Sequence, residues 1–173
     1  PNAKSETCPQ ETGPDLAVGT SPILRTLAGG RRILAVGQKS GIAWGIDPDD
    51  GTVVWQHRVG QGTPLGGIEW GGAADNQFVY YPNADGLLGI NAAGGLAAIR
   101  LATGEREWWA PPIATCPEPT MKCIPAQSAA ASLIPGVVQL DAGLHDASRE
   151  YRIELTMRDG LPYTSRVISD GTL

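Results

Sequence analysis

The stretch Gly41–Trp55, GIAWGIDPDDGTVVW, decides the fold, because the chain repeats its pattern 53 residues later as Gly94–Trp108, GGLAAIRLATGEREW. Four positions keep their residue type at this offset: Gly41 and Gly94, Ile46 and Ile99, Gly51 and Gly104, and Trp55 and Trp108. In each copy an apolar strand ends in a polar turn, where glycine permits a positive φ. The second strand of each copy carries a tryptophan large enough to pack across a sheet. Each copy therefore predicts a β-hairpin.

A further apolar strand is expected ahead of each hairpin. These strands are Arg32–Val36, Gln77–Tyr81 and Gly136–Val138. A period of about 50 residues with a strand, a hairpin and a tryptophan is typical of a β-propeller blade. No blade buries both of its faces alone, so each packs on a neighbour. We predict an all-β fold of about two blades plus the start of a third, which form an open arc and not a closed ring.

The composition agrees with short strands joined by turns. Gly (23) and Pro (14) are frequent among the 173 residues, and only 18% of residues are charged. These values exclude a coiled coil, a helical bundle and a strongly charged disordered chain. The net charge of −5 disfavours nucleic acid and anionic membranes as partners, and no apolar run is long enough to span a membrane. The polar start without Met is expected to be the middle of something longer.

The three cysteines are Cys8, Cys116 and Cys123, and an odd count leaves one free or paired outside this chain. Cys116 and Cys123 lie in a proline-rich loop that backbone pairing cannot hold. We therefore predict a disulfide between them in an oxidising compartment. His57 and His145 match no zinc-ligand spacing, so no zinc site is expected.

The sequence changes character after residue 138, where charged residues become more frequent and the blade signature ends. Tyr151–Arg158 alternates apolar and polar residues, and Asp159-Gly160 follows as a turn signal before a second alternating run. We expect a partial propeller over residues 1–138 and a divergent tail over residues 139–173 that forms a β-hairpin. A chimeric end, a reading-frame shift and a true divergent terminus all fit this pattern.

Four stretches together carry a resemblance to a known family. They are Gly13–Leu24, Val36–Gly41, Gly66–Gly71 and Ala126–Val138. In this order they resemble the pyrroloquinoline quinone (PQQ) dehydrogenases, and most closely the polyvinyl alcohol dehydrogenase branch, over about residues 7–138. The resemblance implies an eight-bladed propeller that oxidises secondary alcohols such as polyvinyl alcohol, with PQQ and Ca²⁺ as cofactors. It also implies electron transfer to a cytochrome c and a periplasmic or extracellular location.

The same resemblance implies the residues of the site. Lys39 matches the basic residue that reaches the quinone oxygens in the family, and a cation suits these electron-rich atoms. Trp70 matches the tryptophan that stacks on the ring system, and Glu69 stands where other members have Asn. We therefore expect Lys39, Trp70 and Glu69 to be the cofactor-binding residues, although the resemblance leaves open whether Glu69 contacts the cofactor or holds a loop. Trp55 and Trp108 are expected to dock one blade on the next instead.

The sequence departs from the family at the catalytic base. Ala17 stands where the family places a catalytic Asp, so we assign no catalytic residue. Asp15 keeps the first acid of that motif, but in a strand it would lie about 6.5–7 Å from the required position. No ligand for Ca²⁺ can be assigned either. We expect a partial quinoprotein alcohol dehydrogenase that is inactive as this chain alone. The alternative is a non-catalytic PQQ-like propeller module that binds other proteins.

Overall fold

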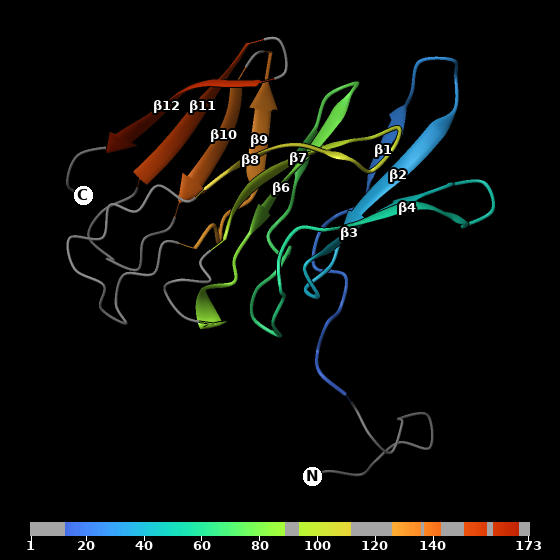
Figure 1. Cartoon of the computed structure of the whole chain (residues 1–173), viewed down its shortest axis with the longest axis horizontal. Coiled ribbons are helices and arrows are strands. Elements are labelled where there is room, and N and C mark those ends of the chain that lie inside the picture. Colours follow the sequence, from blue (N-terminus) through green and yellow to red (C-terminus); the bar gives the residue numbers. More distant parts are fainter. Residues whose placement is uncertain are drawn as a thin grey trace.

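The computed structural model describes residues 13–88, 94–111, 126–135, 137–142, 151–158 and 161–169. In these ranges the chain forms three antiparallel four-stranded sheets that lie side by side (Figure 1). The first sheet contains β1 (Ile23–Thr26), β2 (Arg32–Gly37), β3 (Ile42–Ile46) and β4 (Val53–Arg58). The second contains β5 (Ala73–Ala74), β6 (Phe78–Asn83), β7 (Gly95–Arg100) and β8 (Arg106–Ala110). The third contains β9 (Ala131–Ile134), β10 (Val137–Ala142), β11 (Tyr151–Arg158) and β12 (Leu161–Ser169).

Helical structure in the described part of the chain is limited to the 3₁₀ turn η1 (Gly86–Leu88). None of the described helical segments is long and apolar enough to cross a membrane. The sheets form an open arc, as the repeat predicts. Cys8 and the predicted Cys116–Cys123 disulfide lie outside the described residues, so this pairing stays a prediction.

The two copies of the repeat form the same hairpin. β3 pairs with β4 and β7 pairs with β8, and each pairing shifts register at one point. The shifts fall between Gly45 and Ile46 in the first sheet and between Ala98 and Ile99 in the second, again 53 residues apart. An irregularity at the same position of both copies shows that the repeat extends to the detail of strand pairing.

The third sheet is more complete than the sequence pattern indicates. β11 and β12 pair with each other, and β11 also pairs with β10, so the tail supplies two strands of a four-stranded sheet. Antiparallel pairing needs alternating side chains and a turn, and it does not need the Gly and Trp positions of the repeat. The boundary expected at residue 138 falls inside β10, which runs over Val137–Ala142.

The second sheet is buried between the other two. On β6, Val79 and Tyr81 pack into a core shared with the first sheet, whereas Phe78 and Tyr80 pack into a core shared with the third. This alternation follows from the two-residue period of a strand. Trp55 belongs to the first core and Trp108 to the second, so the expectation that both tryptophans are buried between sheets is confirmed.

Candidate functional site

Loops from both of the first two sheets meet around Lys39, which lies in the turn between β2 and β3. The backbone N–H of Lys39 donates to the carbonyl of Ala17 at 3.1 Å, in the segment that precedes β1. The N–H of Thr63, in the connection from β4 to β5, donates to the carbonyl of Lys39 at 3.1 Å. The N–H of Ile68 donates to the carbonyl of Gln38 at 3.3 Å. The turn that carries Lys39 is therefore held from two directions.

The side chain of Lys39 lies between two carboxylates. Its Nζ is 3.0 Å from Oδ2 of Asp15 and 3.4 Å from Oε1 of Glu69. The Lys39 side chain is only 12% exposed, whereas that of Asp15 is 66% exposed. We call Asp15, Lys39 and Glu69 the Lys39 cluster. It places one sheltered ammonium group between an exposed acid, Asp15, and a partly buried one, Glu69.

The charges of the cluster stabilise one another. The hydrogen bond to Asp15 raises the pKa of Lys39 above its ordinary value, and Glu69 adds to this effect. The hydrogen bond and charge of Lys39 lower the pKa of the Asp15 carboxyl. Lys39 is therefore a cation and Asp15 an anion across the neutral range.

The segment around Trp70 alternates between the core and the surface. Ile68 is fully buried, and a Cβ at Gly37 would collide with its side chain, so this loop packs tightly on the end of β2. Glu69 turns toward Lys39, and Trp70 is 38% exposed. The structure thus brings Lys39 and Glu69 together, and it leaves Trp70, the residue after Glu69, exposed to solvent.

The segment around Ala17 differs from the expectation. Residues 13–19 form no strand, so the spacing that a strand would set between Asp15 and Ala17 does not apply. Pro14 precedes Asp15, and the carbonyl of Pro14 accepts a hydrogen bond from Leu16 at 2.9 Å, which closes a tight local bend. Asp15 reaches Lys39 instead, and the Ala17 side chain is exposed and carries no group that could accept a proton.

Sequence reasoning did not single out Asp85, which lies just after β6. Asp85 is 3% exposed, and its carboxylate accepts hydrogen bonds from the N–H groups of Gln61 at 2.8 Å and Gly62 at 3.0 Å. The side-chain amide of Asn83 donates a third at 2.9 Å. The only sequence signal is the Asn-Ala-Asp-Gly run after an apolar strand, which is typical of any turn.

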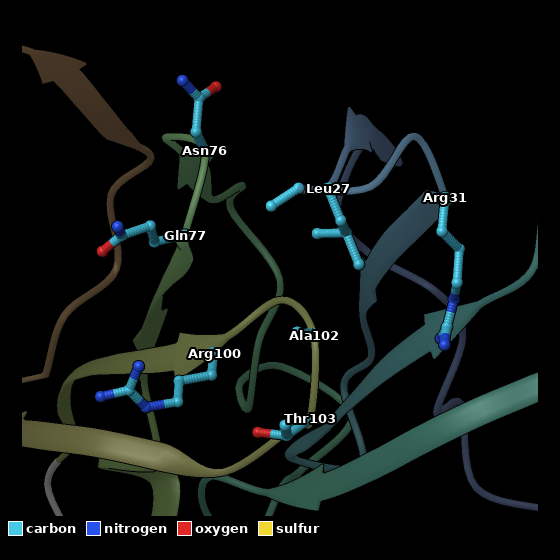
Figure 2. Close-up of a pocket in the computed structure, with 8 residues that line it drawn as sticks. Leu27, Arg31, Asn76, Gln77, Arg100, Ala102 and Thr103 are labelled. Carbon is cyan, nitrogen blue, oxygen red and sulfur yellow. The ribbon is translucent and has the colours of Figure 1, made fainter.

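A cavity of about 460 Å³ opens elsewhere, among the turns that join β1 to β2, β5 to β6 and β7 to β8 (Figure 2). Leu27, Arg31, Gln77, Arg100 and Thr103 are among its lining residues. None of the three residues expected to bind the cofactor lines it, so this cavity is not the expected site. Among the described residues, no group of three or more His, Cys, Asp or Glu side chains is placed to hold a metal ion.

Solved structures identify the class of fold. No protein-family model matches the chain. The quinohemoprotein alcohol dehydrogenase ADHIIG from Pseudomonas putida HK5 superposes with a TM-score of 0.58 at 18% identity, over 88% of this chain and 21% of that one. The quinohemoprotein alcohol dehydrogenase from Comamonas testosteroni superposes with a TM-score of 0.55 at 16% identity, over 89% of this chain and 21% of that one. BamB from Moraxella catarrhalis superposes with a TM-score of 0.53 at 14% identity, over 84% of this chain and 35% of that one. At these identities the likeness shows the fold, and the chain is a PQQ-dehydrogenase-like β-propeller segment.

Sequence comparison narrows the resemblance. The chain is 42% identical over 137 residues to a polyvinyl alcohol dehydrogenase from Pseudomonas sp., which covers 78% of this chain and 21% of the relative. It is 39% identical over 136 residues to the polyvinyl alcohol dehydrogenase from Sphingopyxis sp. (strain 113P3), over 76% of this chain and 21% of the relative. The resemblance to the polyvinyl alcohol dehydrogenases is confirmed. The chain spans about a fifth of the length of these curated relatives.

Proposed function

We propose that this chain forms a cofactor-facing part of a quinoprotein alcohol dehydrogenase, with Lys39, Glu69 and Trp70 in the PQQ site. The observation that carries the proposal is the Lys39 cluster. One sheltered ammonium group is held beside Glu69, on loops that belong to an arc of propeller sheets, and the exposed Trp70 directly follows Glu69 in the chain. The sequence match to polyvinyl alcohol dehydrogenases supports a secondary alcohol as the substrate class.

The residue types fit PQQ, which is planar, carries carboxylates and has an electron-rich ortho-quinone. Lys39 supplies a cation, and Asp15 is exposed enough to turn away and free one of the ammonium hydrogens. Trp70 supplies a flat aromatic surface that is open to solvent. When bound, PQQ supplies the two-electron oxidising chemistry that amino-acid side chains lack.

The side chains of this chain would bind and orient the cofactor. Lys39 would donate hydrogen bonds to quinone oxygens, while Glu69 keeps the ammonium in place. Trp70 would stack on the rings. Neither Ala17 nor Asp15 is assigned the role of general base, since Ala17 has only a methyl group and the carboxylate of Asp15 is paired with Lys39.

We propose further that the parent enzyme passes electrons to a cytochrome c and works in the periplasm or outside the cell. Both statements follow the family that the sequence resembles. This chain alone is proposed to bind PQQ weakly and not to oxidise alcohols, because the arc of sheets is open and Ala17 stands at the expected position of the base.

Quenching of tryptophan fluorescence by added PQQ tests the binding proposal. We expect quenching in the wild-type chain, its loss in Trp70→Ala, and weaker binding in Lys39→Met. Two matched controls should bind as the wild type does. Trp109→Phe removes an indole packed against the first core, and Arg32→Met removes the cation of an exposed ion pair with Asp49. Equal quenching in Trp70→Ala and the wild type would contradict the assignment of Trp70.

The alternative function is a non-catalytic propeller module that binds other proteins. The alkyl side chain of Ala17 at the expected base position favours it. A module of this kind needs neither the ammonium of Lys39 nor an open indole at Trp70. Absence of any PQQ-dependent quenching in the folded wild-type chain would therefore favour the alternative.

A further inference from the structure

We propose that Asp85, just after β6 of the second sheet, is a positioning residue for Lys39, in the turn between β2 and β3 of the first sheet. Its role as a positioner of a cofactor ligand rests on the proposed function. The chain of contacts that connects Asp85 to Lys39 needs no ligand, and it can be tested without one.

The first link joins Asp85 to the turn at Gln61 and Gly62. The carboxylate accepts both backbone N–H groups of this turn, at 2.8 and 3.0 Å, and a third hydrogen bond from Asn83 at 2.9 Å. A buried carboxylate is tolerated only when such donors replace water, and hydrogen bonds to a charged acceptor are strong. Asp85 therefore fixes a turn of the connection from β4 to β5 against the end of β6.

The second link joins that turn to the backbone of Lys39. The N–H of Thr63 donates to the carbonyl of Lys39 at 3.1 Å. Gly62 has a φ of +81°, and a Cβ there would lie 2.5 Å from the same carbonyl oxygen. The turn therefore contacts the backbone of Lys39 directly, and it comes so close at Gly62 that only glycine fits there.

A parallel link runs through the residue next to Asp85. Ala84 and Gly67 exchange two backbone hydrogen bonds, with N···O distances of 2.9 and 3.2 Å. The residue after Gly67 donates to the carbonyl of Gln38, and Glu69 follows it. The end of β6 therefore fixes the main chain of Lys39 and the loop of Glu69 at once.

The test measures how fast Lys39 is acylated by an N-hydroxysuccinimide ester at pH 8, followed by peptide mass spectrometry with Lys4 as the internal reference. In the wild-type chain we expect slow acylation, because the Lys39 side chain is sheltered and paired with Asp15. Asp85→Asn keeps the size of the side chain but presents an NH₂ group to one of the turn N–H donors. We expect Lys39 to react several-fold faster in this variant.

Asp75→Asn is the matched control. Asp75 also accepts three hydrogen bonds, from the N–H groups of Gln77 and Phe78 and from the hydroxyl of Tyr80, each at 2.7 Å. It lies before β6, whereas Asp85 lies after it, so its loss destabilises the same sheet without touching Lys39. We expect Asp75→Asn to lower the melting temperature and to leave the acylation rate of Lys39 unchanged. An unchanged rate in folded Asp85→Asn, or equal acceleration in both variants, would overturn the proposal.

If Asp85→Asn does not fold, Gly62→Ala tests the same connection from the turn. Its control is Gly51→Ala, because Gly51 has a similar φ of +78° but no atom within 4 Å of an added Cβ. We expect faster acylation of Lys39 only in Gly62→Ala, and an unchanged rate there would overturn the positioning role. Acylation requires no PQQ, so failure of the wild-type chain to bind PQQ would reject the proposed function and leave this result standing.

Discussion

Trp55 of the first sheet docks on Gly104 of the second. A Cβ added to Gly104 would lie 2.7 Å from Cγ of Trp55, and the indole N–H donates to the carbonyl of Leu101 at 2.8 Å. Trp55 and Gly104 occupy two of the four repeated positions, one in each copy. The repeat therefore encodes the contact between neighbouring sheets as well as the hairpin itself.

Gly104→Ala is expected to destabilise the chain more than Gly51→Ala. Both glycines have φ near +78°, so alanine costs about 1–2 kcal/mol of backbone strain at either position. Only at Gly104 does the methyl group also meet the docked indole, which adds about 1–3 kcal/mol of overpacking. Urea unfolding of the two variants measures the difference. Equal losses of stability would show that Trp55 does not depend on close contact with Gly104.

His57 is expected to make the stability of the arc depend on pH. Burial, and then the charge of Arg106, lowers the pKa of His57 below its ordinary value of 6.5. The unfolded chain therefore takes up a proton at this residue before the folded chain does. Stability should be fully present above pH 6.5 and should fall as the pH drops through the lowered value.

Thermal unfolding of the wild-type chain and of His57→Gln between pH 5 and pH 8 checks this expectation. Below pH 6.5 the melting temperature of the variant should fall less steeply than that of the wild type. An identical pH profile in both chains would mean that His57 does not contribute.

Added PQQ and Ca²⁺ are expected to produce no alcohol oxidation by this chain. Ala17 cannot accept the alcohol proton, and loss of a positioned base alone costs about 10²–10⁴-fold in rate. The open arc also leaves a bound cofactor in contact with water. A dye-linked assay with a secondary alcohol measures the activity. Turnover above the no-protein control that Lys39→Ala abolishes would contradict this prediction.

The Cys116–Cys123 pairing is a prediction from the sequence. The predicted disulfide in the proline-rich loop would leave one free thiol per chain after oxidative folding, provided that Cys8 stays unpaired. Counting the free thiols of the denatured, unreduced chain shows whether Cys116 and Cys123 are bonded or reduced. Three free thiols would rule the disulfide out.

The sequence by itself determined the repeated unit, because a repeat is local information. Two-residue alternation, a glycine that allows positive φ and a tryptophan at a constant offset predict both hairpins and the docking of Trp55. The third sheet was predicted only in part, since its last two strands lack the Gly and Trp positions. Their pairing with β10 depends on which strand edge lies beside them in space.

Only the tertiary structure decided how the site is assembled. Asp15, Lys39, Glu69 and Asp85 are separated by 16 to 30 residues from one to the next, and none of them lies in a pattern that specifies its partner. Asp15 pairs with Lys39 because residues 13–19 leave the strand conformation that the sequence suggested. Asp85 acts on Lys39 because β6 ends where the connection from β4 to β5 turns back. A carboxylate in a turn looks the same in sequence whether it faces water or is buried against backbone N–H groups, and its environment is set by the packing of the two sheets.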